Sequence, residues 1–151
     1  MELARSYLYI GHMSEDSDSK LGHHGMDVAA LRRSATGFAL DRDDLDDDPI
    51  VQFEDWFRYA CETVPMDPNA VALSTVDSEM RPSSRTVLLK SFDENGFVFY
   101  TNYESKKAEH MVTNPNVSLL FFWSDAARQV KIRGKAEKIP TKESLAYFLS
   151  R

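Results

Sequence analysis

The chain has 151 residues, of which 42% are hydrophobic and 28% are charged. This size and composition predict one soluble globular domain with a real core, and no apolar run approaches the ~20 residues of a membrane-spanning helix. The formal net charge of −6 argues against nucleic acid as the main partner, because phosphate chains bind to basic faces. One small anionic ligand needs only a local cluster of cations and is not excluded.

The single cysteine, Cys61, excludes an internal disulfide and favours a reducing compartment. Because no histidine lies close to it in sequence, we predict a buried helical thiol rather than a nucleophile. The acidic N-terminal residues and the short apolar run 8–10 argue against a transit or signal peptide. A cytoplasmic protein without a membrane partner is therefore expected.

Residues 1–27 mix Ser, Asp, Gly and His without periodicity, which predicts a mobile tail before a domain at 28–151. His23 and His24 have no third ligand at a useful spacing, so no metal site is predicted. Residues 28–33 fit a short helical turn. This turn contains Arg32 and Arg33, the one basic spot before the acidic run 41–48.

A helix is predicted from Asp48 and Pro49 to about Val64. Asp is a good N-cap, and Pro fits the first turn because its missing N–H is not needed there. The preceding aspartates suit the positive end of the helix, and they lack the Gly and closing Glu of a calcium loop. Apolar residues at helical spacing give the helix one core-facing side: Phe53, Trp56, Phe57, Ala60 and Val64.

Alternation and turn residues predict about five strands after this helix. The expected strands are 70–76, 86–89, 97–100, 117–123 and 129–132, the last continuing past Gly134, with short helices at 105–112 and 142–150. We expect 117–123 to be buried on both faces because it is almost entirely apolar. Strand 129–132 alternates polar and apolar residues, so one of its faces should be open to water or a ligand.

The stretch 85–107 combines a hairpin with cations at both ends. Asn95-Gly96 between two apolar runs is a strong hairpin signal, since both residues tolerate positive φ. Arg85 and Lys90 lie on its first strand, and Lys106 and Lys107 follow its second. Ser105 could cap a helix there, and a helix start offers N–H groups to an anion.

This arrangement suggests a phosphate-bearing ligand laid along a sheet. The alternative is a solvated hairpin with ordinary surface cations, which composition alone favours. No Gly-rich phosphate loop, dinucleotide fingerprint, nucleophile elbow or zinc spacing is present. The pattern by itself therefore predicts a mainly β domain with flanking helices (α+β), as a small barrel or sandwich.

Several separated segments together resemble the pyridoxine/pyridoxamine 5′-phosphate oxidase family, in the family's order. They are LRRSATGF (31–38), DLDDDPIVQFEDWF (44–57), RTVLLKSFDENGFVFYTNYESKK (85–107), NPNVSLLFFW (114–123), RQVKIRGKAEKIP (128–140) and AYFLSR (146–151). The resemblance implies a flavin-binding split β-barrel that works as a homodimer with FMN at the interface. It implies oxidation of the 4′ carbon of pyridoxine or pyridoxamine 5′-phosphate to give pyridoxal 5′-phosphate, with O2 as acceptor.

The resemblance also assigns site residues. FMN would be held by Arg85, Thr86, Val87 and Leu88 on one strand, Tyr100 and Thr101 on the next, Lys106 and Lys107 at the phosphate, and Gln129 at the flavin. The substrate phosphate would be gripped by Lys90, Tyr147 and Arg151, with Arg32 and Arg33 in a lid. No catalytic base is identified.

Two departures from the family leave alternatives open. Ala35 stands where the family usually has Tyr, and family members continue well beyond Arg151, so the C-terminal part of the fold is expected to be missing. One alternative is a non-catalytic form that binds FMN or pyridoxal phosphate weakly or pairs with a full-length subunit. Another is a different split-barrel flavoprotein such as a flavin reductase, against which the set Lys90, Tyr147 and Arg151 argues.

Overall fold

The structure is a computed structural model, which describes residues 40 and 42–139. These residues all belong to one unit of the chain, Gly37–Arg151. The elements in order are η2 (Arg42–Asp44), α1 (Pro49–Thr63), β1 (Ala70–Val76), β2 (Pro82–Asp93), β3 (Gly96–Phe99), α2 (Lys106–Thr113), β4 (Asn116–Trp123) and β5 (Arg128–Lys135). The predicted features at 28–33 and 142–150, like His23 and His24, lie outside the described residues.

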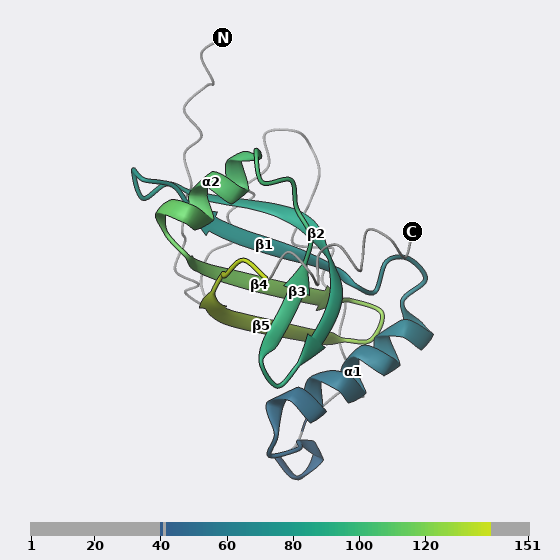
Figure 1. The fold of residues 1–151 in the computed structure, drawn as a ribbon. Helices are drawn as coiled ribbons and strands as arrows, with labels where there is room; N and C mark the ends of the chain where they lie inside the picture. The colour runs from purple at the N-terminus through teal and green to yellow at the C-terminus, as the bar shows by residue number, and fades with distance from the viewer. Residues whose placement is uncertain (1–39, 41, 140–151) are drawn as a thin grey trace, which may run out of the picture. The chain divides into compact units, whose positions relative to one another are not determined.

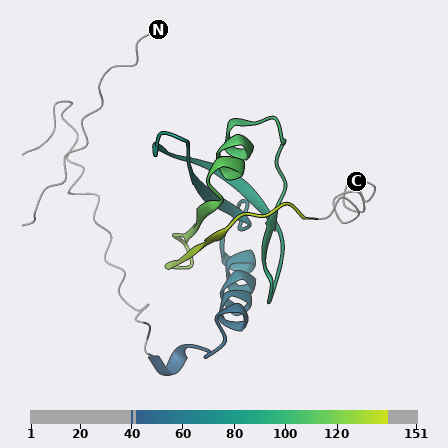
Figure 2. The same ribbon diagram turned by 60° about the vertical axis from the view of Figure 1, so that its left-hand side comes forward.

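Five antiparallel strands form one sheet in the order β3-β2-β1-β4-β5. The sheet curls, so that the β2–β3 hairpin crosses in front of β4 and β5 (Figure 1), and the turned view shows the hairpin and β4–β5 as two separate walls (Figure 2). The result is an open half-barrel, which confirms the predicted split β-barrel class. Neither described helix is long and apolar enough to cross a membrane.

Strand register decides which residues share the inner face of the half-barrel. Leu73 on β1 lies opposite Arg85 on β2 and opposite Leu119 on β4, and Leu119 lies opposite Ile132 on β5. Because side chains alternate along a strand, Thr86 and its same-face neighbours belong to the outer face. The inner face carries the core, with Val71, Leu73, Leu119 and Phe121 buried.

Helix α1 covers one end of this inner face. The Asp48 carboxylate accepts a hydrogen bond from the Ile50 N–H at 2.8 Å, and Pro49 follows it, as predicted for the helix start. The Phe53 ring meets four rings of the sheet with centroids 4.8 to 6.0 Å apart, belonging to Phe92, Phe97, Phe121 and Trp123. The predicted aromatic stripe is therefore core.

The hairpin turn forms at the predicted place, but the residue that organises it is Asp93 rather than Asn95. The Asp93 carboxylate accepts from the backbone N–H of Asn95 at 2.8 Å and of Gly96 at 3.2 Å. Within the described residues of the hairpin, only Gly96 has a positive φ, at 147°. Asn95 thus does not use the conformational freedom that the sequence argument gave it, because the Asp93 side chain organises the turn instead.

Two burial predictions are wrong. Cys61 is exposed, because it lies on the solvent side of α1 next to the buried Ala60. Strand β4 is not buried on both faces, since Phe122 is 69% exposed between the buried Phe121 and Trp123. Nothing in the described part of the chain covers the outer face at this point, so the strand alternates like a half-buried strand despite its apolar composition.

Candidate functional site

Arg85 is half-buried on the inner face of β2, and neutral acceptors hold its guanidinium. Nη1 donates to the Leu73 carbonyl oxygen at 3.2 Å and to Thr75 Oγ1 at 2.8 Å, and Nη2 donates to Ser83 Oγ at 2.7 Å. Within the described residues no carboxylate pairs with it. A guanidinium has five N–H donors, so Nε–H and one Nη2–H are left without a described partner.

Thr75 links this guanidinium to helix α2. Its Oγ1 lies 3.0 Å from His110 Nδ1, and the Thr75 side chain is fully buried. His110 is four residues after Lys106, so the two lie one above the other on the same side of α2. Arg85 is thereby connected, through two hydrogen bonds, to the helix that begins with Lys106 and Lys107.

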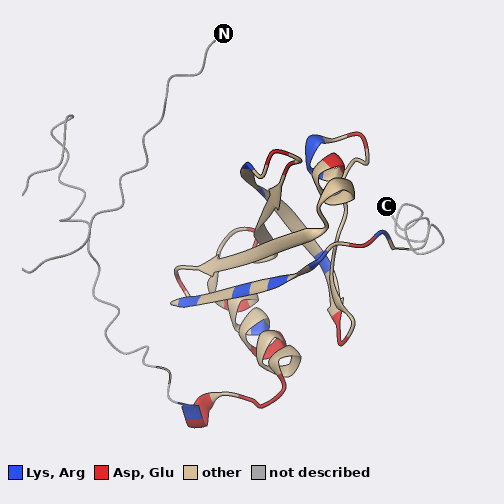
Figure 3. Ribbon diagram, turned by 90° about the vertical axis from the view of Figure 1, so that its left-hand side faces the viewer, with Lys and Arg blue, Asp and Glu red and all other residues tan. Residues whose placement is uncertain are grey.

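The start of α2 has no side-chain cap. Ser105 occupies the N-cap position as predicted, but its Oγ donates to the Asn102 carbonyl oxygen at 2.7 Å and makes no capping bond. Thr101 Oγ1 lies 3.5 Å from Ser105 Oγ, at the limit of a hydrogen bond. The first N–H groups of the helix are therefore not used by a side chain, and two lysines stand beside them (Figure 3).

A separate cavity of about 1320 Å³ lies between the hairpin, the 100–104 loop, α2 and the end of β5. Its apolar lining includes Phe97, Phe99, Met111, Val117 and Ile132. Four cations and two carboxylates also line it: Lys90, Arg133, Lys135, Lys138, Glu104 and Glu137. The cavity thus combines an apolar wall with a surplus of positive charge, which suits a ring compound carrying an anionic group.

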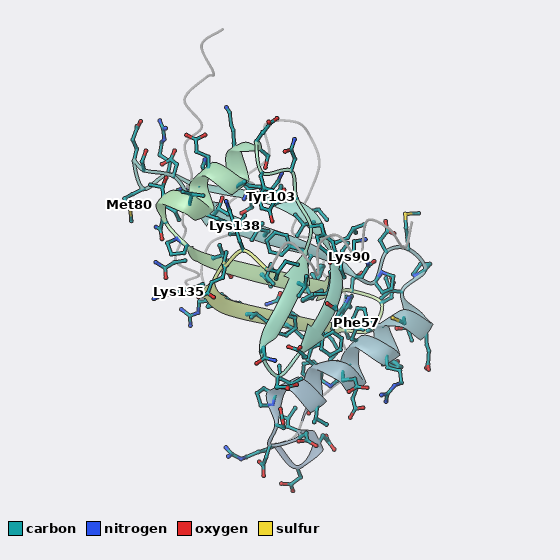
Figure 4. The ribbon with its side chains drawn as sticks, in the orientation of Figure 1. Phe57, Met80, Lys90, Tyr103, Lys135 and Lys138 are labelled. Atoms are coloured by element: carbon teal, nitrogen blue, oxygen red, sulfur yellow. The ribbon has the colours of Figure 1, made fainter. Side chains whose placement is uncertain are left out.

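The cationic residues of the cavity come from different elements. Figure 4 shows Lys90 on β2 and Lys135 at the end of β5, with Tyr103 and Lys138 close together below α2. Lys138 Nζ lies 5.0 Å from the centre of the Tyr103 ring, which is the geometry of a cation–π contact. Basic residues are spaced along β5 as well (Figure 3), and Lys131 and Arg133 are exposed there.

The predicted site residues therefore fall into three places. Leu88, Lys90, Tyr100 and Thr101 line the cavity, whereas Arg85, Val87, Lys106 and Lys107 belong to the inner face and α2 and do not line it. Thr86 and Gln129 are exposed on the outer face, where Gln129 lies opposite Phe122. Arg32, Arg33, Tyr147 and Arg151 are outside the described residues.

Sequence reasoning missed Thr75 and His110, which the structure connects to Arg85. Thr75 reads as an ordinary strand residue, and His110 lies 35 residues away from it in the chain. The register of β1 with β2, which puts Thr75 opposite Ser83, and the packing of α2 against β1 together bring the three polar side chains into contact.

The chain is similar to a known enzyme family over most of its described length. The sequence family described as "Pyridoxamine 5'-phosphate oxidase" matches residues 57–151. A protein of Rippkaea orientalis named pyridoxine/pyridoxamine 5′-phosphate oxidase is 57% identical over 126 residues, which cover 83% of this chain and 59% of that protein. A protein of the same name from Aliarcobacter butzleri is 55% identical over 126 residues. The chain thus spans about 59% of the length of these curated relatives.

Solved structures give the same result for the fold. PhzG from Burkholderia lata 383, in complex with tetrahydrophenazine-1-carboxylic acid, superposes with a TM-score of 0.68 at 28% identity, covering 76% of this chain and 57% of that one. A pyridoxamine 5′-phosphate oxidase-related, FMN-binding protein from Nostoc punctiforme superposes with a TM-score of 0.50 at 20% identity, which bears on the fold alone. With the family matched over residues 57–151 and its half-barrel present, the chain belongs to the pyridoxamine 5′-phosphate oxidase family.

Proposed function

We propose that this chain is a subunit of an FMN-dependent oxidase that converts pyridoxine or pyridoxamine 5′-phosphate to pyridoxal 5′-phosphate, with O2 as acceptor. The proposal includes a homodimer in the cytoplasm, with no nucleic-acid or membrane partner. The observation that carries it is the Arg85 guanidinium, uncompensated by any described carboxylate and linked to an uncapped helix start, in a chain of this family. Such a constellation suits a dianionic phosphate.

The residues present fit FMN. Arg85 has two N–H donors to offer, and Lys106 and Lys107 add charge beside the first N–H groups of α2, which no described side chain caps. The rest of the cofactor would be held by backbone and side-chain contacts from six further residues: Thr86, Val87, Leu88, Tyr100, Thr101 and Gln129. FMN, when bound, supplies the two-electron redox chemistry, so the chain's own residues bind, orient and shield.

Lys90 is the described residue proposed to bind the substrate phosphate. It lines the cavity, whose apolar wall suits a pyridine ring and whose cations suit the phosphate. Tyr147 and Arg151 are proposed to complete this grip, and Arg32 and Arg33 to contribute to a lid. Hydrogen bonds from ammonium, guanidinium and phenol groups to a dianion are of the strong, charge-assisted kind.

The first experiment tests the purified 151-residue chain for bound flavin by its absorbance, and then for pyridoxal phosphate formed from pyridoxine phosphate under air. Flavin with turnover is the expected result. Flavin without turnover would select the non-catalytic alternative. A colourless protein that does not take up added FMN contradicts the proposal.

Two variants separate the roles of the cations. Arg85→Ala should lose FMN, and Lys90→Ala should keep FMN but raise the KM for pyridoxine phosphate roughly 10- to 150-fold, the value of one charge-assisted contact. Arg58→Ala is the control, because Arg58 is exposed on α1 and its described ion-pair partners, Glu54 and Asp55, belong to the same helix. Equal flavin content in Arg85→Ala and the control would refute the Arg85 assignment.

A further inference from the structure

Thr75 is the one polar side chain among the fully buried residues of the described core. It lies near the end of β1, the central strand of the sheet, and shares its face with Val71 and Leu73. A valine would fill the same space without a buried hydroxyl. Burying a hydroxyl costs free energy unless it is hydrogen-bonded, so its two polar contacts explain its presence better than packing does.

The hydrogen bonds of Thr75 connect Arg85 to His110. Arg85 Nη1 can only donate, so Thr75 Oγ1 accepts at 2.8 Å. The hydroxyl keeps its own proton, and His110 Nδ1 lies 3.0 Å from Oγ1. When the imidazole carries its proton on Nε2, Nδ1 accepts from the hydroxyl, and the polarity then runs from Arg85 through Thr75 to His110.

This connection fixes the guanidinium without neutralising it. The three acceptors of Arg85 are a carbonyl and two hydroxyl oxygens, so the guanidinium keeps its full positive charge. Its orientation is set from β1 and β2, and Nε–H and one Nη2–H remain for a ligand. A cation already held in its binding orientation loses less conformational entropy when an anion binds.

We propose that Thr75 and His110 are positioning residues that hold the Arg85 guanidinium in place for the phosphate group of the cofactor. This inference rests on the proposed function, because it takes the phosphate of FMN as the ligand of Arg85. It adds that affinity for the phosphate, and not for the flavin ring, depends on a buried hydroxyl and an imidazole that themselves touch no ligand.

The test compares FMN with riboflavin, which has the same ring and no phosphate. Both are titrated into the full chain while quenching of flavin fluorescence is followed. Thr75→Val, which keeps the volume and removes the hydroxyl, should weaken FMN roughly 3- to 10-fold, the usual worth of one hydrogen bond, and leave riboflavin affinity unchanged. Thr75→Ser, which keeps the hydroxyl, should restore FMN affinity to within about twofold of the unmodified chain.

A second pair of variants covers the case in which Thr75→Val fails to fold. His110→Leu removes the acceptor from a half-buried helix position, whereas His110→Asn keeps an acceptor near Nδ1. His110→Leu should weaken FMN selectively, and His110→Asn should recover most of the loss. Equal weakening of FMN and riboflavin in Thr75→Val or His110→Leu would indicate a purely structural role and overturn the inference.

Arg85→Ala in the same titration separates this inference from the proposed function. If Arg85→Ala loses the preference for FMN over riboflavin while Thr75→Val and His110→Leu keep it, the positioning role is wrong and the phosphate site stands. If Arg85→Ala keeps the preference as well, the phosphate site itself is wrong and the inference falls with it.

Discussion

Met80 has a backbone conformation that is unfavourable for a residue with a side chain. It has a φ of 62° in the turn that joins β1 and β2, and its N–H donates to the Asp77 carbonyl oxygen at 3.1 Å. The left-handed region costs a non-glycine residue roughly 1–2 kcal/mol. The side chain is 72% exposed and projects from the turn (Figure 4), so little packing compensates for this cost.

Met80→Gly should therefore raise the free energy of unfolding by about 0.5–1 kcal/mol, after the entropy that glycine adds to the unfolded chain is subtracted. Urea denaturation measures the change. Ser78→Gly is the matched control: Ser78 is an exposed residue of the same turn without a positive φ, so this variant should be destabilised. A loss of stability in Met80→Gly would show that the turn does not hold this conformation in solution.

The same turn contains a carboxylate whose titration is coupled to folding. The Arg81 backbone N–H, followed by its guanidinium, donates to Asp77 and lowers the pKa of the Asp77 carboxyl below the ordinary value of 3.8. A carboxyl whose pKa is lower in the folded than in the unfolded state stabilises the fold at pH values above its unfolded pKa. This stabilisation is lost as the pH falls through the folded pKa. Asp77→Asn should therefore destabilise the protein at pH 7 and make less difference at pH 3.

Denaturation midpoints at the two pH values check this expectation. Arg81→Gln removes the guanidinium, so its denaturation midpoint should also decrease less between pH 7 and pH 3 than that of the unmodified chain. If the denaturation midpoint of Asp77→Asn decreases as much between pH 7 and pH 3 as that of the unmodified chain, the acid sensitivity belongs to other carboxylates.

At the residue scale, what the sequence predicts is the chemistry of single positions rather than their partners. The capping bond of Asp48 is a local interaction, because the Asp48 carboxylate and the Ile50 N–H that donates to it are two residues apart. The bonds of Arg85 to Thr75 and of Thr75 to His110 span 10 and 35 residues. No periodicity reports such a pairing, since it arises only when β1 pairs with β2 and α2 packs over them.

At the scale of elements, the β2–β3 hairpin depends on one glycine. Gly96 follows the Glu94-Asn95 turn, pairs with Asp93 and has a φ of 147°, a conformation that L side chains rarely adopt. Open space surrounds the position of a Cβ there, so backbone strain alone decides the outcome of a substitution.

Gly96→Ala should lower stability by about 1–2 kcal/mol, measured as a fall in the urea midpoint. Gly134→Ala on β5 supplies the comparison, because its Cβ would also meet nothing within 4 Å and its φ lies outside the strained range. Alanine at Gly134 should be neutral or slightly stabilising. Equal effects at both positions would mean that the Gly96 backbone relaxes at no cost.

Elements were predictable where their ends carry local signals. Helix α1 begins at Asp48-Pro49, and α2 ends before Asn114-Pro115, as their capping and proline signals indicate. Strand β4 shows the limit, because its composition indicates two buried faces whereas Phe122 is exposed. Composition reports how apolar a strand is, and only the arrangement of the neighbouring elements decides which face is covered.

At the scale of the whole described unit, the resemblance predicts the class of fold and the backbone arrangement supplies the strand order. Strands β1 and β4 pair although a hairpin and a helix separate them in the chain. This pairing divides the predicted site residues between an inner face, an outer face and a cavity, which a reading along the sequence cannot do. The outer face then has the one large exposed aromatic ring of the described strands, that of Phe122.

The proposed homodimer gives this outer face a partner. Phe122 is 69% exposed, and a second subunit is the occupant that the family resemblance implies. Phe122→Asp would bury an unpaired charge in such an interface, so the variant should shift the dimer towards monomer by at least tenfold in dissociation constant.

Sedimentation or light scattering over a range of concentrations measures the shift. Met66→Asp is the control, because Met66 is 78% exposed and lies in the loop before β1, outside the sheet. Because the proposed FMN site lies at the dimer interface, Phe122→Asp should also lose flavin as it dissociates, whereas Met66→Asp should keep it. A Phe122→Asp protein that remains dimeric and coloured would show that the subunits meet through another surface.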